Sequence, residues 1–249
     1  MKRTLIILLI LTTGLCSQAT EVADSSKDAE QSSWKGDVQF GYVMSSGNTE
    51  SDNLNGKFNI EHRVADWKQH LSLVAFSSSD NDQTTAERYK LEYQANKKFT
   101  DSGYLFVNTT YEDDRFSGFE NRSTLTVGYG LQVYNANKMT LDTEAGVGIR
   151  QSKLSPDPVT GTSPSDREGM VRLAAKYLWQ IEEDRSLISN LTIEVGEEST
   201  ISNFEVGFVT MIAGDLSLKA SYVARHTSEV PLGKEKLDTV TSLNLLYAF

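Results

Sequence analysis

Apolar and polar residues alternate with a period of two along most of this chain. The pattern is clearest in the last segment, 237–249 (LDTVTSLNLLYAF). Every second residue from Thr241 to Phe249 lies on one mainly apolar face, whereas Ser242 and Asn244 lie on the other. One apolar and one polar face over about ten residues is typical of a membrane-spanning β-strand. A soluble strand can end in the same way, so the interpretation depends on the rest of the chain.

The same alternation recurs throughout the chain from Trp34 onward and predicts twelve strands. Their alternating faces lie within 34–44, 54–64, 67–75, 89–95, 105–111, 125–133, 141–149, 171–181, 187–195, 204–212, 216–224 and 237–249. Long polar loops and short turns join them in alternation. An even strand number with this asymmetry is typical of a single-chain outer-membrane barrel. The predicted fold is therefore all-β, a closed antiparallel transmembrane β-barrel of twelve strands.

A soluble β-sandwich is the alternative fold. A sandwich buries one face of each sheet as a core and does not expose so many period-two aromatic and aliphatic side chains. A sheet in hydrocarbon must close because its edge has no other hydrogen-bond partner. Aromatic residues near the short turns would form an interfacial girdle. These are Trp34, Trp67, Phe99, Tyr104, Tyr134, Trp179, Tyr247 and Phe249.

The start of the chain carries an export signal. Lys2 and Arg3 precede an apolar run, and small residues end at Ala19, so residues 1–19 are interpreted as a signal peptide. Cys16 raises a lipoprotein alternative, but Leu15 stands where a lipobox needs a small residue, and Cys16 is expected to leave with the signal. Residues 20–33 are polar and acidic and predict a disordered periplasmic lead-in. The barrel domain is expected at 34–249.

The bulk composition is that of a soluble protein, with 39% hydrophobic residues and a net charge of −10. After the signal, no run approaches the roughly 18 apolar residues of a transmembrane helix. An exported chain without such a run is usually periplasmic or secreted, but a β-barrel is the exception because alternation halves its apparent hydrophobicity. The expected location is the Gram-negative outer membrane, with both termini in the periplasm. The negative charge disfavours nucleic-acid binding.

The chain ends on an aromatic residue that carries the terminal carboxylate. Tyr247 and Phe249 resemble the C-terminal signal by which the outer-membrane assembly machinery recognises its barrels. The expected partners are that assembly machinery, outer-membrane lipids and lipopolysaccharide. A monomer is the favoured state.

Several short motifs carry a family resemblance across the mature chain. They are Trp34-Lys35-Gly36, Ser46-Gly47-Asn48-Thr49, Glu87-Arg88-Tyr89, Tyr111-Glu112-Asp113-Asp114-Arg115-Phe116, Gly128-Tyr129-Gly130, Asp238-Thr239 and Tyr247-Ala248-Phe249. This set resembles the salt-induced outer-membrane protein family (YdiY-like, a domain-of-unknown-function family). Membership implies an outer-membrane barrel and a link to salt or osmotic response, and it implies little about activity.

The polar faces of the strands would line the lumen with both signs of charge. One interpretation is cross-strand ion pairing that fills a narrow barrel, and the other is a hydrated pore with charge rings. Gly128, Gly130, Gly146 and Gly148 would leave one wall bare, either for a channel or for larger side chains from opposite. The predicted lumen-lining residues are Lys57, Arg63, Arg88, Glu92, Asp142, Glu144, Arg150, Arg172, Lys176, Glu194, Glu205, Lys219 and Arg225.

Acidic residues concentrate in the predicted long loops, where they would form a solvated surface or hold divalent cations. No loop has the D-x-D-x-D-G spacing of a calcium site, so no metal and no cofactor is expected. The loop carboxylates are Glu50, Asp52, Asp80, Asp82, Asp113, Asp114, Glu120, Asp157, Asp166, Glu168, Glu197 and Glu198.

One arrangement suggests an enzyme. His226 and Ser228 would lie on the outward face at a strand end, and Glu235 or Asp238 would orient the histidine. The pair resembles the outer-membrane lipid A deacylases, but Glu229 stands where those enzymes have asparagine. The main prediction is a passive barrel, either a narrow channel or a structural envelope protein. The alternative is a deacylase-like hydrolase.

Overall fold

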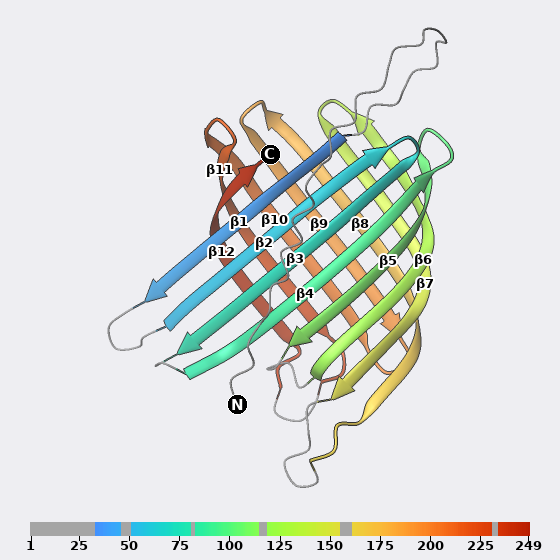
Figure 1. Cartoon of the computed structure of the whole chain (residues 1–249), viewed down its shortest axis with the longest axis vertical. Helices are drawn as coiled ribbons and strands as arrows, with labels where there is room; N and C mark the ends of the chain where they lie inside the picture. Colours follow the sequence, from blue (N-terminus) through green and yellow to red (C-terminus); the bar gives the residue numbers. More distant parts are fainter. Residues whose placement is uncertain (1–32, 46–50, 81–82, 115–118, 155–160, 231–233) are drawn as a thin grey trace, which may run out of the picture. The chain divides into compact units, whose positions relative to one another are not determined.

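The computed structural model describes residues 33–45, 51–80, 83–114, 119–154, 161–230 and 234–249. Twelve strands run through them (Figure 1). Their bounds are β1 Ser33–Ser45, β2 Ser51–Val64, β3 Trp67–Asp80, β4 Gln83–Lys98, β5 Gly103–Asp114, β6 Phe119–Ala136, β7 Met139–Leu154, β8 Ser165–Glu182, β9 Arg185–Gly196, β10 Thr200–Ala213, β11 Leu216–Thr227 and β12 Leu237–Ala248. Among the described residues, no helix is long and apolar enough to cross a membrane.

Each strand pairs antiparallel with its neighbours in sequence, and β1 pairs with β12, so the sheet is a closed ring. The prediction of a closed antiparallel barrel of twelve strands is confirmed. The signal peptide and nearly all of the 20–33 lead-in lie outside the described residues.

The strands extend further into the predicted long loops than the apolar pattern indicates. For example, the polar stretch 77–85 is largely β3 and β4, which continue pairing to Asp80 and Gln83. Backbone hydrogen bonds do not need apolar side chains. The alternation therefore ends where hydrocarbon contact would end, while the ladder continues beyond it.

The outward face of the barrel is apolar, and no other part of the described chain covers its large side chains. Phe40 is 55% exposed, Leu105 57% and Val147 61%, and each belongs to the predicted outward set. Large apolar side chains exposed on most strands would be unfavourable in water, and they match a surface that faces lipid.

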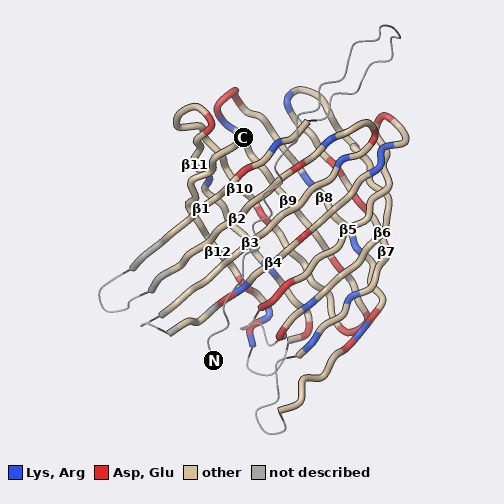
Figure 2. The backbone as a smooth tube through the Cα atoms, in the orientation of Figure 1, with Lys and Arg blue, Asp and Glu red and all other residues tan. Residues whose placement is uncertain are grey.

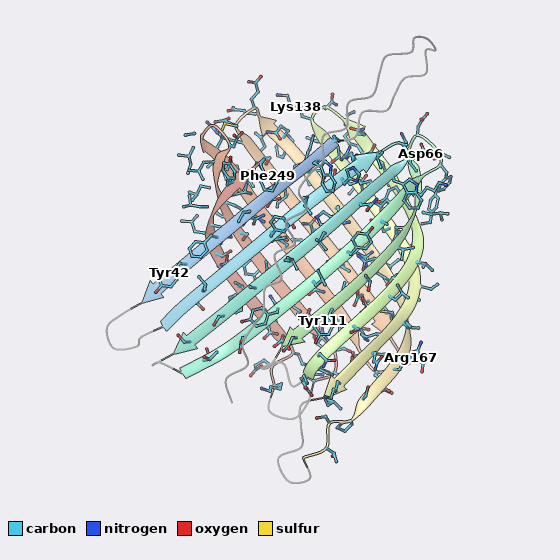
Figure 3. The ribbon with its side chains drawn as sticks, viewed as in Figure 1. Tyr42, Asp66, Tyr111, Lys138, Arg167 and Phe249 are labelled. Atoms are coloured by element: carbon cyan, nitrogen blue, oxygen red, sulfur yellow. The ribbon has the colours of Figure 1, made fainter. Side chains whose placement is uncertain are left out.

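Short turns and the chain end share one end of the barrel. Ala65 has a φ of 49°, and Asn137 and Lys138 have φ of 52° and 63°, as the two-residue turns that match strand twist require. Figure 3 shows Phe249 at the same end as Asp66 and Lys138, whereas Tyr42, Tyr111 and Arg167 lie toward the other end.

The seam that closes the barrel is its shortest ladder. β1 and β12 pair from Asp37↔Ala248 to Phe40↔Leu245, whereas β1 follows β2 along its whole length. Gly36 and Phe249 extend the seam through two backbone hydrogen bonds of 2.8 and 2.9 Å. A Cβ on Gly36 would lie 2.5 Å from the Phe249 ring. The terminal aromatic ring therefore covers a glycine that leaves space for it.

Replacing Gly36 by valine should destabilise the closed barrel by about 1–3 kcal/mol, because the new side chain overlaps the Phe249 ring at the weakest seam. Gly56→Val is the matched control on the outward face of β2, where the nearest atom to a new Cβ is 4.0 Å away. After refolding into lipid vesicles, the compact band on an unheated gel measures the folded fraction. It should fall for Gly36→Val and not for Gly56→Val, and equal fractions would contradict the seam's role.

Candidate functional site

The interior of the barrel is polar. Period-two alternation directs the polar face of each strand inward. Among the described residues, the buried apolar side chains are Phe106, Met170, Ala174 and Ile201, while the buried polar and charged ones are far more numerous. Figure 2 shows Lys and Arg interspersed with Asp and Glu along the strands. The lumen, not an apolar core, is therefore the candidate functional site.

Glu144 on β7 is the centre of one polar cluster, and its side chain is 1% exposed. It accepts hydrogen bonds from Arg172 Nη1 at 2.8 Å and Lys176 Nζ at 3.4 Å, both on β8. Gln94 Nε2 on β4 donates at 2.7 Å, and Tyr104 Oη on β5 donates at 3.0 Å. One carboxylate thereby connects four strands, and its buried charge is compensated from several sides.

Tyr104 and Phe106 fill the glycine wall. The Tyr104 ring covers Gly130, where any added Cβ would collide with it. A Cβ on Gly128 would lie 2.7 Å from the Phe106 ring, and one on Gly146 would lie 3.0 Å from it. Of the two alternatives for this wall, filling by larger side chains is the correct one, although they come from adjacent β5. The prediction of Tyr104 in the outer aromatic girdle is wrong, since its hydroxyl bonds inward to Glu144.

Arg150 on β7 anchors a second cluster and is 0% exposed. Its Nε donates to Glu168 Oε1 on β8 at 2.8 Å, and its Nη2 donates to the Ser199 carbonyl and, at 3.1 Å, to Ser199 Oγ. Glu168 Oε2 also accepts from the Glu198 backbone N–H at 2.7 Å. These bonds tie the β9–β10 connection to β7 and β8.

A third contact crosses the lumen. Arg225 Nη1 on β11 bonds to Glu112 Oε1 on β5 and lies 3.9 Å from Asp114 Oδ2 on the same strand. β11 and β5 are six strands apart in either direction around the ring. The Arg225–Glu112 pair therefore crosses the lumen between opposite strands and narrows the lumen there.

A fourth cluster connects the strands on both sides of the closing seam. Lys219 Nζ on β11 lies 2.7 Å from Glu205 Oε1 on β10 and 3.3 Å from Gln39 Oε1 on β1. Lys57 Nζ on β2 lies 3.8 Å from Glu205 Oε2. These contacts bridge over β12 and supplement the short β1–β12 ladder.

A cavity remains among these side chains, with about 70 Å³ of space for solvent. Threonine, asparagine and Ile201 side chains form part of its lining. Its charged lining comprises Lys90, Arg122, Arg172 and Arg225 with Glu92, Glu112 and Glu194. This space exceeds the roughly 10–15 Å³ that one water molecule needs.

The other predicted lumen residues make more local contacts. Glu92 pairs with Lys90 on its own strand at 3.0 Å, and Arg63 pairs with Glu61 at 2.6 Å. Asp142 accepts from Gln132 Nε2 at 3.2 Å, and Arg88 lies 6.0 Å from the Phe76 ring centroid. Side-chain contacts in the lumen therefore include pairs within one strand as well as pairs between different strands.

Two carboxylates assigned to the outer loops belong to the lumen clusters. Asp114 approaches Arg225, and Glu168 binds Arg150. Both lie in strands that extend beyond the predicted ends, and alternation from Glu112 and Arg172 would have placed them inward. Sequence reasoning also missed the contributions of Gln94 and Phe106, which carry no charge. Among the described residues, no group of three or more His, Cys, Asp or Glu side chains is arranged to hold a metal ion.

The hydrolase residues do not form a triad. His226 is exposed, and Ser228 Oγ accepts a hydrogen bond from the Thr200 backbone N–H at 2.9 Å. Within the described residues, no hydrogen bond joins His226 to Ser228 or Glu235. The serine instead fixes the start of β10.

Closed strand topology, an apolar outer face and a charged interior define this protein as a transmembrane β-barrel of outer-membrane type. The chain belongs to the family described as "Protein of unknown function, DUF481", whose model matches residues 38–249. It is 28% identical over 221 residues to "Uncharacterized protein YdiY" of Escherichia coli (strain K12), covering 86% of this chain and 83% of that protein. The predicted YdiY-like membership is confirmed.

Solved structures with a similar fold are also outer-membrane barrels. An outer-membrane channel of Pseudomonas putida F1 matches with a TM-score of 0.54 at 12% identity, covering 91% of this chain and all of that one. The translocator domain of the autotransporter NalP from Neisseria meningitidis matches with a TM-score of 0.52 at 13% identity, covering 88% and 89%. At these identities the likeness concerns the fold.

Replacing Glu144 by glutamine should destabilise the barrel by about 3–5 kcal/mol, because Arg172 then lacks its carboxylate in a buried site. Glu182→Gln is the control, since Glu182 pairs with Arg185 at 3.6 Å where both side chains are exposed. That change should cost about 0–1 kcal/mol. Urea unfolding in lipid vesicles measures both, and similar losses would show that the Glu144 cluster is not a stabilising centre.

Proposed function

We propose that this protein lies in the outer membrane and acts as a narrow passive channel for small ions and solutes. The observation that carries the proposal is the solvent-sized cavity among the paired charges of the lumen. A barrel whose interior were packed with apolar side chains would leave no hydrated path. Here charged and hydroxyl side chains surround the remaining space, as in other aqueous pores.

Small conductance is expected because the lumen is constricted. The Arg225–Glu112 pair crosses the lumen between opposite strands, and Phe106 and Tyr104 occupy the glycine wall. Weak ion selectivity is also expected, since both signs of charge line the path and most of them neutralise each other. A structural envelope protein with a sealed lumen is the rival within the passive class.

Replacing Arg225 by alanine should increase single-channel conductance in planar bilayers, because it removes the side chain that spans the lumen. Lys68→Ala is the control: Lys68 pairs with Glu61 at 3.1 Å, its side chain is 41% exposed, and its loss leaves the crossing contact intact. Recordings at several salt concentrations would measure both effects. If the parent and Arg225→Ala are both electrically silent, the channel proposal fails and a sealed structural barrel remains.

The proposed orientation places the short turns and both termini in the periplasm. It follows outer-membrane barrels in general, whose long loops face outward. A role in salt or osmotic response is an expectation from the family resemblance, and the dependence of expression on salt would test it.

Orientation can be tested with single cysteines, because Cys16, in the predicted signal peptide, is the chain's one cysteine. Glu229→Cys lies after β11 at the long-loop end, and Asp215→Cys lies in the short β10–β11 turn. A membrane-impermeant thiol reagent should label Glu229→Cys on intact cells and Asp215→Cys only after the outer membrane is opened. The reverse pattern would invert the orientation.

A further inference from the structure

Among the described residues, one buried cation in the lumen has no carboxylate partner. Arg122 on β6 is 6% exposed and lines the lumen cavity described above. Its Nε donates to Ser152 Oγ at 3.3 Å, and its guanidinium carbon lies 4.1 Å from the Phe119 ring centroid. Among the described residues, no carboxylate lies within 4 Å of it. A buried guanidinium without a counter-charge is costly, so it normally has an anion nearby.

The strand register explains why Arg122 lacks a partner. Glu112 is directly opposite Arg122 on β5 and would be its natural cross-strand partner. Instead, the Glu112 carboxylate bonds across the lumen to Arg225. On the other side, the residue opposite Arg122 is the neutral Ser152. The contact that narrows the barrel therefore leaves a positive charge at the cavity wall.

The other charges of the cavity are largely neutralised. Lys90 pairs with Glu92, Arg172 pairs with Glu144, and Glu194 lies 4.0 Å from Arg150 Nη1. Among the described charged residues that line the cavity, Arg122 is therefore the one without an ion pair, which favours an anion over a cation beside it.

We propose that the cavity beside Arg122 binds a small carboxylate anion of about the size of acetate. A guanidinium fork matches the two oxygens of a carboxylate and can bind both at once. Stacking on Phe119 holds the Arg122 group in place before binding, which reduces the entropy lost on binding. Thr110 and Thr124, whose hydroxyl oxygens lie 2.7 Å apart, also line the cavity and offer further donors. The limited space excludes larger organic anions.

A role for this site in ion passage rests on the proposed channel, whereas binding itself does not. The test therefore measures binding without current. The refolded full-length mature barrel is unfolded by urea in vesicles while sodium gluconate is replaced by sodium acetate at constant ionic strength. Acetate should raise the unfolding midpoint of the parent in a saturable manner, because a ligand that binds the folded state stabilises it.

Arg122→Gln should weaken the acetate affinity about tenfold or more, because it removes a charge-assisted pair of hydrogen bonds. Arg122→Lys should weaken it as well, since lysine keeps the charge without the fork. Arg63→Gln is the control, because Arg63 is an exposed arginine on the inner face of β2 that already pairs with Glu61. It should respond to acetate as the parent does.

Three results would overturn the site: no acetate effect in the parent, an equal effect in Arg122→Gln, or an effect of chloride as large as that of acetate. The first would indicate a cavity that holds water alone. The second would indicate that acetate stabilises the barrel at some place other than Arg122, and the third would indicate a site without carboxylate preference. A barrel that binds acetate but carries no current would refute the channel and keep the site. A barrel that conducts ions but shows no acetate effect would refute the acetate site and keep the channel.

Discussion

The requirement that no strand edge remain unpaired is the constraint on which this structure depends. Hydrocarbon offers no hydrogen-bond partner, so the first and last strands must meet. They do so over a short ladder, from Asp37↔Ala248 to Phe40↔Leu245, which the Gly36–Phe249 backbone pair extends. The residue that ends the chain thus also completes the ring. The Lys219 cluster, which reaches Gln39 on β1, supports the same seam from inside.

Closure also determines what the interior can be. Because the apolar face of every strand contacts lipid, the polar faces all point into the lumen. A buried charge there is costly unless an opposite charge or a hydrogen-bond partner compensates it. Glu144, Arg150 and Lys219 find them on nearby strands, and Arg225 finds Glu112 across the ring. The network both stabilises the wall and restricts the space left for solvent. The same network of paired side chains therefore accounts for both the stability of the barrel and the narrowness of its lumen.

Local alternation was enough to predict the strand number, the closed fold and the outward faces, because the residues within each strand define its apolar and its polar face. It also indicated most of the charged lumen residues. It did not predict partners: Arg225 and Glu112 are 113 residues apart, and only ring closure brings them together. Tyr104 was misplaced because an aromatic residue near a turn resembles a girdle residue, although its alternation with exposed Leu105 points inward. Glu168 was misplaced because the pairing continues past the apolar pattern.

The central claim is that charges on opposite walls hold each other across the lumen. A double-mutant cycle of Arg225→Gln and Glu112→Gln, measured by urea unfolding in lipid vesicles, tests it most directly. A contact across the ring predicts a coupling free energy of about 1 kcal/mol or more, since contacting charged residues are not independent. Losses that add to within about 0.3–0.5 kcal/mol would show that the two side chains do not interact, and would contradict the account.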